Sequence, residues 1–194
     1  MLLRLATPFD GPALAAIYRP SVVERVTSFE LDPPDGAEMA RRVERCLART
    51  PWLVAEREGV VVGYAYAGLH RERPAYQWSV ETSAYVRDDA HRSGVARALY
   101  GSLSAILALQ GFRNAYAGIT LPNAASEGFH ESFGFRRVGV YHGVGYKFGA
   151  WHDVLWLERA ILPRVPDPPP PVSLPALRSD RASAAAFESA LAGR

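Results

Sequence analysis

Two kinds of hydrophobic pattern run along the chain, and together they predict helices packed on a sheet. Apolar residues spaced by three and four positions predict helices, and glycine just past such a segment predicts its left-handed C-terminal cap. The predicted helices begin after Asp10, after Asp35, at Val95 and near Asn123, and the last two end at Gly111 and Gly134. Runs rich in β-branched and aromatic residues predict strands at 2–6, 52–68 (a hairpin turning at Glu58 and Gly59), 76–86, 113–120 and 136–161 (two strands). This order predicts an α/β (α+β) fold with a mixed sheet.

The start of the long predicted helix has an unusual charge pattern. A helix start favours Ser, Thr, Asp or Asn and acidic neighbours, but this one carries His91, Arg92 and Arg97 around Gly94. Cations are unfavourable at the positive end of a helix dipole unless an anion binds there. The pattern therefore favours a site for an anionic ligand, with an ordinary capped helix as the alternative.

Two common phosphate-binding motifs do not fit this turn. The segment AHRSGVAR lacks the Lys and Ser/Thr that end a mononucleotide P-loop. It also has one glycine where a dinucleotide site has three. What remains is a strand, a short turn and a helix whose free N–H groups can hold a pyrophosphate.

Composition narrows the class of protein. The chain has 194 residues, 48% hydrophobic and 22% charged, so we expect one globular domain with a sizeable core. The net charge is only +2, which gives no reason to expect nucleic acid as a partner. The single cysteine, Cys46, cannot form an internal disulfide, which fits a reducing, cytoplasmic compartment. We find no secretory segment and no run of about 20 apolar residues, so we expect a soluble protein that does not bind membranes.

One boundary divides the chain. Residues 163–175, PRVPDPPPPVSLP, can form neither a helix nor the interior of a sheet, so they predict an extended strap. The strap separates a domain of residues 1–162 from an Ala-rich tail, residues 176–194. The sequence leaves open whether this tail is helical or disordered.

The basic turn resembles a known cofactor loop. HRSGVA after a strand resembles the acetyl-CoA pyrophosphate loop of the GCN5-related N-acetyltransferases (GNAT), with His91 where that motif has Gln or Arg, and Ala96 at its second glycine. The segments PWLVAE, GYAYAG, AYQWSVETSAYV, LALQGF, LPN and GYKFGAWHDV, in this order and followed by the Pro-rich segment, are similar to the phosphinothricin acetyltransferase family. The likeness covers roughly residues 3–175. It implies the GNAT fold, a mostly antiparallel mixed sheet flanked by helices, with acetyl-CoA as co-substrate, no metal ion, and a homodimer.

Two side chains are candidates for the proton transfers that acetyl transfer requires. Glu81 lies in the apolar strand WSVETSAYV, where burial would prepare it as a general base, the role that the resemblance implies. A solvent-facing glutamate on an edge strand is the alternative. His130 lies where the wider superfamily often has a tyrosine that protonates the departing thiolate; an imidazole can act there as acid or base, and a satisfied surface histidine is the alternative. Phe135 ends that helix, so we expect no phenol there.

The resemblance and the residue types also predict binding contacts. A substrate with a carboxylate and a phosphinate, sulfone or sulfoximine group needs guanidinium groups and aromatic walls, although solvated loop charges and core aromatics are the alternative for each candidate. The predicted acceptor contacts are Phe29, Arg71, Arg73, Tyr76 and Lys147. The predicted acetyl-CoA contacts are Tyr85, Val86, His91, Arg92, Ser93, Gly94, Val95, Ala96, Arg97 and Asn123.

These observations predict an acetyl-CoA-dependent N-acetyltransferase acting on the α-amine of a small amino acid analogue. The sequence does not choose between phosphinothricin, methionine sulfoximine and methionine sulfone. A protein or peptide N-acetyltransferase and a non-catalytic acyl-CoA-binding module are the alternatives.

Overall fold

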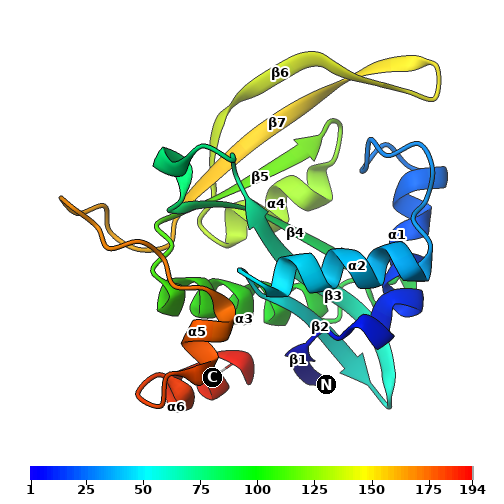
Figure 1. Cartoon of the computed structure of the whole chain (residues 1–194). Helices are drawn as coiled ribbons and strands as arrows, with labels where there is room; N and C mark the ends of the chain where they lie inside the picture. The colour runs from blue at the N-terminus through cyan, green and yellow to red at the C-terminus, as the bar shows by residue number, and fades with distance from the viewer. Residues whose placement is uncertain (194) are drawn as a thin grey trace.

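A computed structural model describes residues 1–193 and contains a seven-stranded sheet with helices on both faces (Figure 1). The strands lie in the order β1-β2-β3-β4-β5-β7-β6. They are β1 (Leu2–Leu5), β2 (Trp52–Arg57), β3 (Val60–Leu69), β4 (Ser79–Val86), β5 (Asn114–Thr120), β6 (Arg136–Lys147) and β7 (Ala150–Ala160). The helices are α1 (Gly11–Val23), α2 (Gly36–Leu47), α3 (Val95–Gln110), α4 (Ala124–Ser132), α5 (Leu174–Ser179) and α6 (Ala184–Leu191), with short 3-10 turns at Pro8–Asp10, Pro74–Tyr76 and Asp88–Ala90.

One strand pair differs from all the others. Each neighbouring pair is antiparallel except β4 and β5, which run parallel. Their pairing joins only Ser79–Glu81 to Asn114–Tyr116, and beyond Glu81 the two strands separate (Figure 1). The sheet is therefore open in its middle, on the carboxyl side of Glu81.

The two faces of the sheet bury separate cores, because successive side chains of a strand point to opposite faces. Leu53 and Ala65 face α3 and pack in one cluster with Leu103. Val54 and Tyr64 face α1 and α2 and belong to a second cluster. Burying each large apolar side chain contributes about 1.5–3 kcal/mol, so both clusters hold the helices firmly against the sheet.

The predicted hairpin turn and the predicted C-terminal cap of the long helix are confirmed by their backbone angles. Glu58 and Gly59 turn the β2–β3 hairpin with φ of 50° and 78°, and Gly111 ends α3 with φ of 93°. Asp10 precedes α1 but makes no side-chain capping bond to it. Its carboxylate instead accepts hydrogen bonds from the Arg4 guanidinium at 2.8 Å, so it joins this helix to β1.

The segment after the sheet packs on the domain. In the strap, the Pro169 carbonyl accepts a hydrogen bond of 2.8 Å from the indole of Trp78. The tail forms α5 and α6, and Leu177 and Phe187 join the core cluster on the α3 face. The division into a domain, a strap and a tail stays a prediction, but the tail is helical over most of its described length. None of the helices in residues 1–193 has the length and apolarity needed to span a bilayer.

Candidate active site

A cleft of about 810 Å³ opens where β4 and β5 separate. One wall is the end of β4 and the loop that leads into α3; the other is the end of β5 and α4. Since β4 and β5 do not pair here, backbone N–H and C=O groups along this edge are available to a ligand. The cleft is large enough to hold a sizeable part of an extended cofactor.

The loop before α3 has the backbone geometry expected of an anion site. Gly94 precedes the helix with φ of 84° and Arg92 has φ of 57°, both in the left-handed region. The Ser93 hydroxyl donates to the Ala90 carbonyl at 2.6 Å, which closes the loop. His91 Nε2 lies 2.9 Å from the Val86 carbonyl and so donates to it, which ties the loop to the end of β4. The first N–H groups of α3, free of helical partners, therefore lie at the mouth of the cleft.

Most of the predicted acetyl-CoA contacts meet in this cleft. Ser93 belongs to the same loop, but its hydroxyl is directed to the Ala90 carbonyl and it does not line the cleft. Arg25 also lines the cleft and forms an ion pair of 2.5 Å with Asp88. It lies about 60 residues before the α3 loop in sequence, so no local pattern predicted that it lines the cleft. The predicted residues that line it are Tyr85, Val86, His91, Arg92, Gly94, Val95, Ala96, Arg97 and Asn123.

Glu81 lies at the last paired position before β4 and β5 separate. Its carboxylate accepts hydrogen bonds from His70 Nδ1 at 2.9 Å and from the Arg71 guanidinium at 3.0 Å. The side chain is 37% exposed, so the expectation that it is buried in an apolar strand is wrong. It is held by two polar neighbours at the opening, on the α1/α2 face of the sheet.

His70 is a residue that the sequence argument missed. Its ring stacks on Tyr116, the cross-strand neighbour of Glu81, with centroids 4.3 Å apart. The rings of Tyr76 and Trp156 stand edge-on to it at 6.0 Å. Aromatic packing therefore fixes the imidazole that contacts Glu81. Only the register of β3 against β4 brings the two together, and no local pattern reveals it.

On the opposite face, His130 forms a hydrogen-bonded pair with Tyr100. His130 Nδ1 lies 2.8 Å from the Ser126 carbonyl, which can only accept, so Nδ1 carries the proton. Its Nε2 is then the acceptor for the Tyr100 hydroxyl at 2.9 Å, and that hydroxyl also lies 3.3 Å from Thr82 Oγ1. Burial lowers the pKa of His130, partly offset by its bond to the Ser126 carbonyl, and raises the pKa of Tyr100. Both groups are therefore neutral near pH 7, and both line the cleft.

Tyr100 supplies a phenol to the site from a position that the sequence argument did not consider. Phe135 is indeed buried beside His130, with ring centroids 5.1 Å apart, but the hydroxyl comes from α3 instead. Tyr100 follows Leu99 and precedes Leu103 on the buried face of that helix. In sequence it is indistinguishable from a core aromatic, which is why it was missed.

The predicted acceptor contacts do not form one cluster. Arg71 and Tyr76 lie beside His70 and Glu81, and no side-chain hydrogen bond or ion pair of Arg73 is found within residues 1–193. Phe29 packs against the β6–β7 hairpin, near His152. None of these residues lines the cleft.

Lys147 requires a correction. It is 3% exposed, and its ammonium donates to the backbone carbonyls of Ser28, at 2.6 Å, and Ser21, at 3.4 Å. Burial lowers the pKa of Lys147. Its donors are used to hold the segment around α1 against β6, so it offers no free cation to a substrate.

Known proteins share this architecture. The acetyltransferase (GNAT) domain family matches residues 3–156. The phosphinothricin N-acetyltransferase of Streptomyces viridochromogenes is 40% identical over 172 residues, 88% of this chain and 94% of that protein. An L-methionine sulfoximine/L-methionine sulfone acetyltransferase of Pseudomonas aeruginosa is 34% identical over 158 residues, 80% of this chain and 92% of that protein. The crystal structure of a phosphinothricin acetyltransferase from Sinorhizobium meliloti in complex with AcCoA matches with a TM-score of 0.81 and 35% identity, covering 87% of this chain and 91% of that one.

The matches extend over the strands and helices that build the cleft, so the fold is that of a GNAT acetyltransferase. The mostly antiparallel sheet flanked by helices is confirmed. Within that superfamily, the chain belongs to the phosphinothricin N-acetyltransferase family.

Proposed function

We propose that the protein transfers the acetyl group of acetyl-CoA to the α-amine of a small amino acid analogue of the phosphinothricin, methionine sulfoximine or methionine sulfone type. The observation that carries this proposal is the placement of Glu81 and the Tyr100–His130 pair. They lie on opposite faces of the sheet at the same opening, because Glu81 and Thr82 are consecutive in β4 and Thr82 contacts Tyr100. Acetyl transfer needs such an arrangement, because a base must take up protons from the amine and a second group must stabilise the departing sulfur.

The cofactor occupies the cleft in this proposal. The pyrophosphate lies at the start of α3, where free N–H groups, the helix dipole and the Arg92 and Arg97 cations favour an anion. The pantetheine arm runs between β4 and β5, where the unpaired backbone edge provides donors and acceptors. The thioester then reaches the point next to Glu81 where the pairing of the two strands ends. A relative crystallised with AcCoA supports this assignment.

Glu81 accepts one proton of the substrate ammonium, directly or through water, and releases it to solvent before the neutral amine attacks the thioester carbon. As the C–S bond breaks, Glu81 accepts the second proton that the nitrogen loses when the amide forms. Its bonds to His70 and Arg71 hold the carboxylate in place, and its partial exposure lets the proton pass to solvent. A positioned base of this kind contributes roughly 10²–10⁴ in rate.

The departing sulfur accepts a hydrogen bond from the Tyr100 hydroxyl in this proposal. That group donates to His130 Nε2 in this structure and can turn its proton toward a thiolate as the C–S bond breaks. Since burial raises the pKa of Tyr100, a hydrogen bond to the sulfur is favoured over complete proton transfer. His130 is proposed to orient this hydroxyl through its Nε2, and its predicted role as acid or base stays a prediction.

The acceptor lies on the α1/α2 face. Arg71 and Arg73 follow β3 on that side, away from the α3 start that serves the phosphates, and are proposed to hold its acidic groups, with Tyr76 as an aromatic wall. Phe29, near the β6–β7 hairpin, is proposed to bound the same space.

We also propose a cytoplasmic homodimer. The β6–β7 hairpin exposes several large apolar side chains along its length, and this exposure supports an interaction surface there. These are Val138, Tyr141, Val144, Tyr146, Phe148 and Trp151. The free thiol of Cys46, whose pKa burial raises to about 11, fits a reducing compartment. Light scattering of the purified protein tests the dimer, and a monomer at micromolar concentration would exclude it.

The decisive experiment measures thiol release from acetyl-CoA with a panel of acceptors. Acetylation of phosphinothricin or methionine sulfone, with loss of turnover in Glu81→Gln, supports the proposal. Turnover with protein substrates but with no free amino acid analogue would favour a protein N-acetyltransferase. Acetyl-CoA binding without turnover of any acceptor would favour a binding module.

A further inference from the structure

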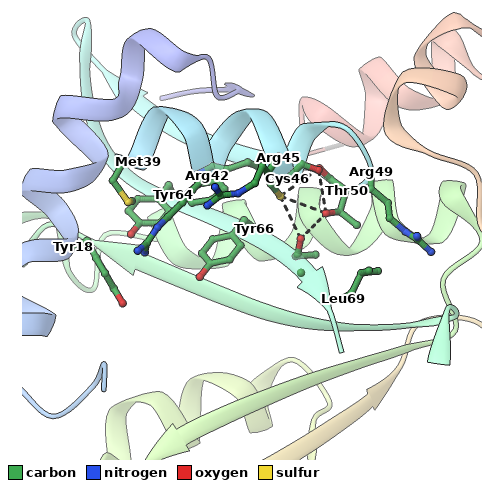
Figure 2. Close-up of a pocket in the computed structure, with 13 residues that line it drawn as sticks. Tyr18, Met39, Arg42, Arg45, Cys46, Arg49, Thr50, Tyr64, Tyr66 and Leu69 are labelled. Carbon is green, nitrogen blue, oxygen red and sulfur yellow. Dashed lines mark hydrogen bonds between the residues drawn. The ribbon is translucent and has the colours of Figure 1, made fainter. Parts of the chain in front are cut away.

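A second pocket, of about 330 Å³, lies beneath α2 on the α1/α2 face of the sheet (Figure 2). Its lining comes from α1, α2, β2 and β3, and it shares no lining residue with the acetyl-CoA cleft. It lies on the same face of the sheet as Glu81, the side from which an acceptor approaches in the proposed reaction.

Aromatic rings form the floor of this pocket. Trp52 stacks on Tyr66 with centroids 4.2 Å apart and an interplanar angle of 12°, and on Tyr64 at 5.5 Å. Met39 and Leu69 add apolar surface, and the labelled rings lie below α2 in Figure 2. Trp52 and Tyr64 are only 3% and 1% exposed, so they support the floor from below, and the half-buried Tyr66 ring presents its surface to the pocket. Such a flat ring favours a ligand with an apolar body.

The rim carries positive charge only. Three of the thirteen lining residues are charged, and all three are arginines on or just after α2: Arg42, Arg45 and Arg49. Arg42 is engaged by Glu30 at 2.7 Å and Glu38 at 2.9 Å. Arg45 makes one longer contact, 3.3 Å to Glu38, and is 67% exposed. For Arg49 no side-chain hydrogen bond or ion pair is found within residues 1–193. Arg45 and Arg49 therefore have donors left for an anionic group.

The pocket begins beside Glu81. Gly68, one of its lining residues, is the cross-strand partner of Glu81, and such partners have Cβ positions about 4.5–5.5 Å apart on one face. A Cβ built on Gly68 meets nothing within 4 Å, so open space adjoins the carboxylate there. From Gly68 the floor follows β3 back to Tyr64, which is four residues and therefore about 13 Å. The side chain of a single amino acid does not reach that far.

We propose that this pocket receives the distal part of an extended acceptor, a peptide of two or three residues. Its N-terminal amine lies at Glu81, its apolar side chains lie on Tyr66, and its C-terminal carboxylate binds Arg45, while Arg49 lies nearer the Gly68 and Leu69 end of the pocket (Figure 2). Such a peptide spans about 7–10 Å, so it covers the part of the floor nearest Gly68 and does not reach Tyr64. The inference rests on the proposed function in one respect, that the amine is acetylated next to Glu81.

Two matched pairs of variants test this, with methionine sulfone and the dipeptide Ala-Phe as acceptors. Gly68→Leu fills the entrance from an unstrained position, and Gly101→Leu adds the same group at an exposed glycine of α3 that also meets nothing within 4 Å. Arg45→Gln removes a rim cation, and Arg41→Gln removes a neighbouring α2 arginine that contacts Glu38 but does not line the pocket.

We expect the wild type to acetylate Ala-Phe and to use its C-terminal amide roughly tenfold less well, since a charge-assisted hydrogen bond is lost. We expect Gly68→Leu to lower the ratio of kcat/KM for Ala-Phe to that for methionine sulfone by tenfold or more. Arg45→Gln should raise KM for Ala-Phe about threefold to tenfold, and both control variants should leave the ratio unchanged. Acetylation of methionine sulfone without any of Ala-Phe, or an unchanged ratio in Gly68→Leu, overturns this inference but not the proposed function. If the wild type acetylates neither acceptor, this inference is overturned, and turnover of phosphinothricin then decides whether the proposed function stands.

Discussion

A carboxylate introduced at Ala96 separates cofactor binding from fold stability, because it affects the two in opposite directions. Ala96 is the second residue of α3 and lines the cleft, and the first turn of this helix contains no acidic residue. In Ala96→Asp the new charge lies at the positive end of the helix dipole, which stabilises the helix by about 0.3–1 kcal/mol. The ligand-free protein should therefore unfold at the same temperature as wild type or a few degrees higher.

The same charge repels the pyrophosphate. At about 5 Å and an effective dielectric constant of about 20, two like unit charges repel by about 3 kcal/mol, which is more than a hundredfold in Kd. Ala96→Asn has nearly the same size without the charge and should lose far less affinity. Calorimetric titration with CoA measures the affinity, and thermal unfolding without ligand measures the stability. A folded Ala96→Asp protein that binds CoA as tightly as Ala96→Asn would refute the assignment of the phosphates to the start of α3.

Four further predictions concern chemistry and pH. Glu81→Gln should lower kcat by roughly 10²–10⁴ and keep acetyl-CoA affinity, as measured by steady-state kinetics and titration; near wild-type kcat across the pH range excludes Glu81 as the base. Replacing Arg71 or Arg73 with Ala should raise KM for the amino acid and leave KM for acetyl-CoA unchanged, and the reverse result contradicts their assignment. His70→Asn can keep a donor near the position of Nδ1 and should retain more kcat than His70→Phe, which keeps only the ring; equal losses would make the hydrogen bond to Glu81 irrelevant. Folding lowers the pKa of His130, so below about pH 6.5 the unfolded chain binds a proton that the folded protein does not, and the free energy of unfolding should fall as the pH drops. Denaturant titrations should show a weaker pH dependence for His130→Gln, and a pH profile identical to wild type would contradict this prediction.

Features with a local physical cause could be predicted from the sequence. The turn at Glu58 and Gly59 and the C-terminal cap at Gly111 follow from the left-handed backbone that glycine allows. The basic start of α3 follows from a conflict between charge and helix dipole within a few residues, and those residues do line the cleft. Each of these signals spans only a few consecutive residues, so the order of residues along the chain determines their positions in space.

The features that were missed depend on contacts between distant elements. Tyr100 and His130 meet through the packing of α3 against α4, and His70 reaches Glu81 through strand register. Lys147 is occupied by carbonyls more than 100 residues away in sequence. None of these pairs has a local pattern, because the side chains involved have types that are also common in cores and on surfaces.

The packing of α5 and α6 on α3 has a consequence for how the protein is made. Phe187 belongs to the same core cluster as Leu103, so the cofactor-binding helix completes its packing only after a segment about 80 residues further along has been synthesised. At about 5–20 residues per second, this leaves the apolar face of α3 partly uncovered on the ribosome for roughly 4–16 seconds. During that interval the face that Leu103 shares with Phe187 is open to association with other chains.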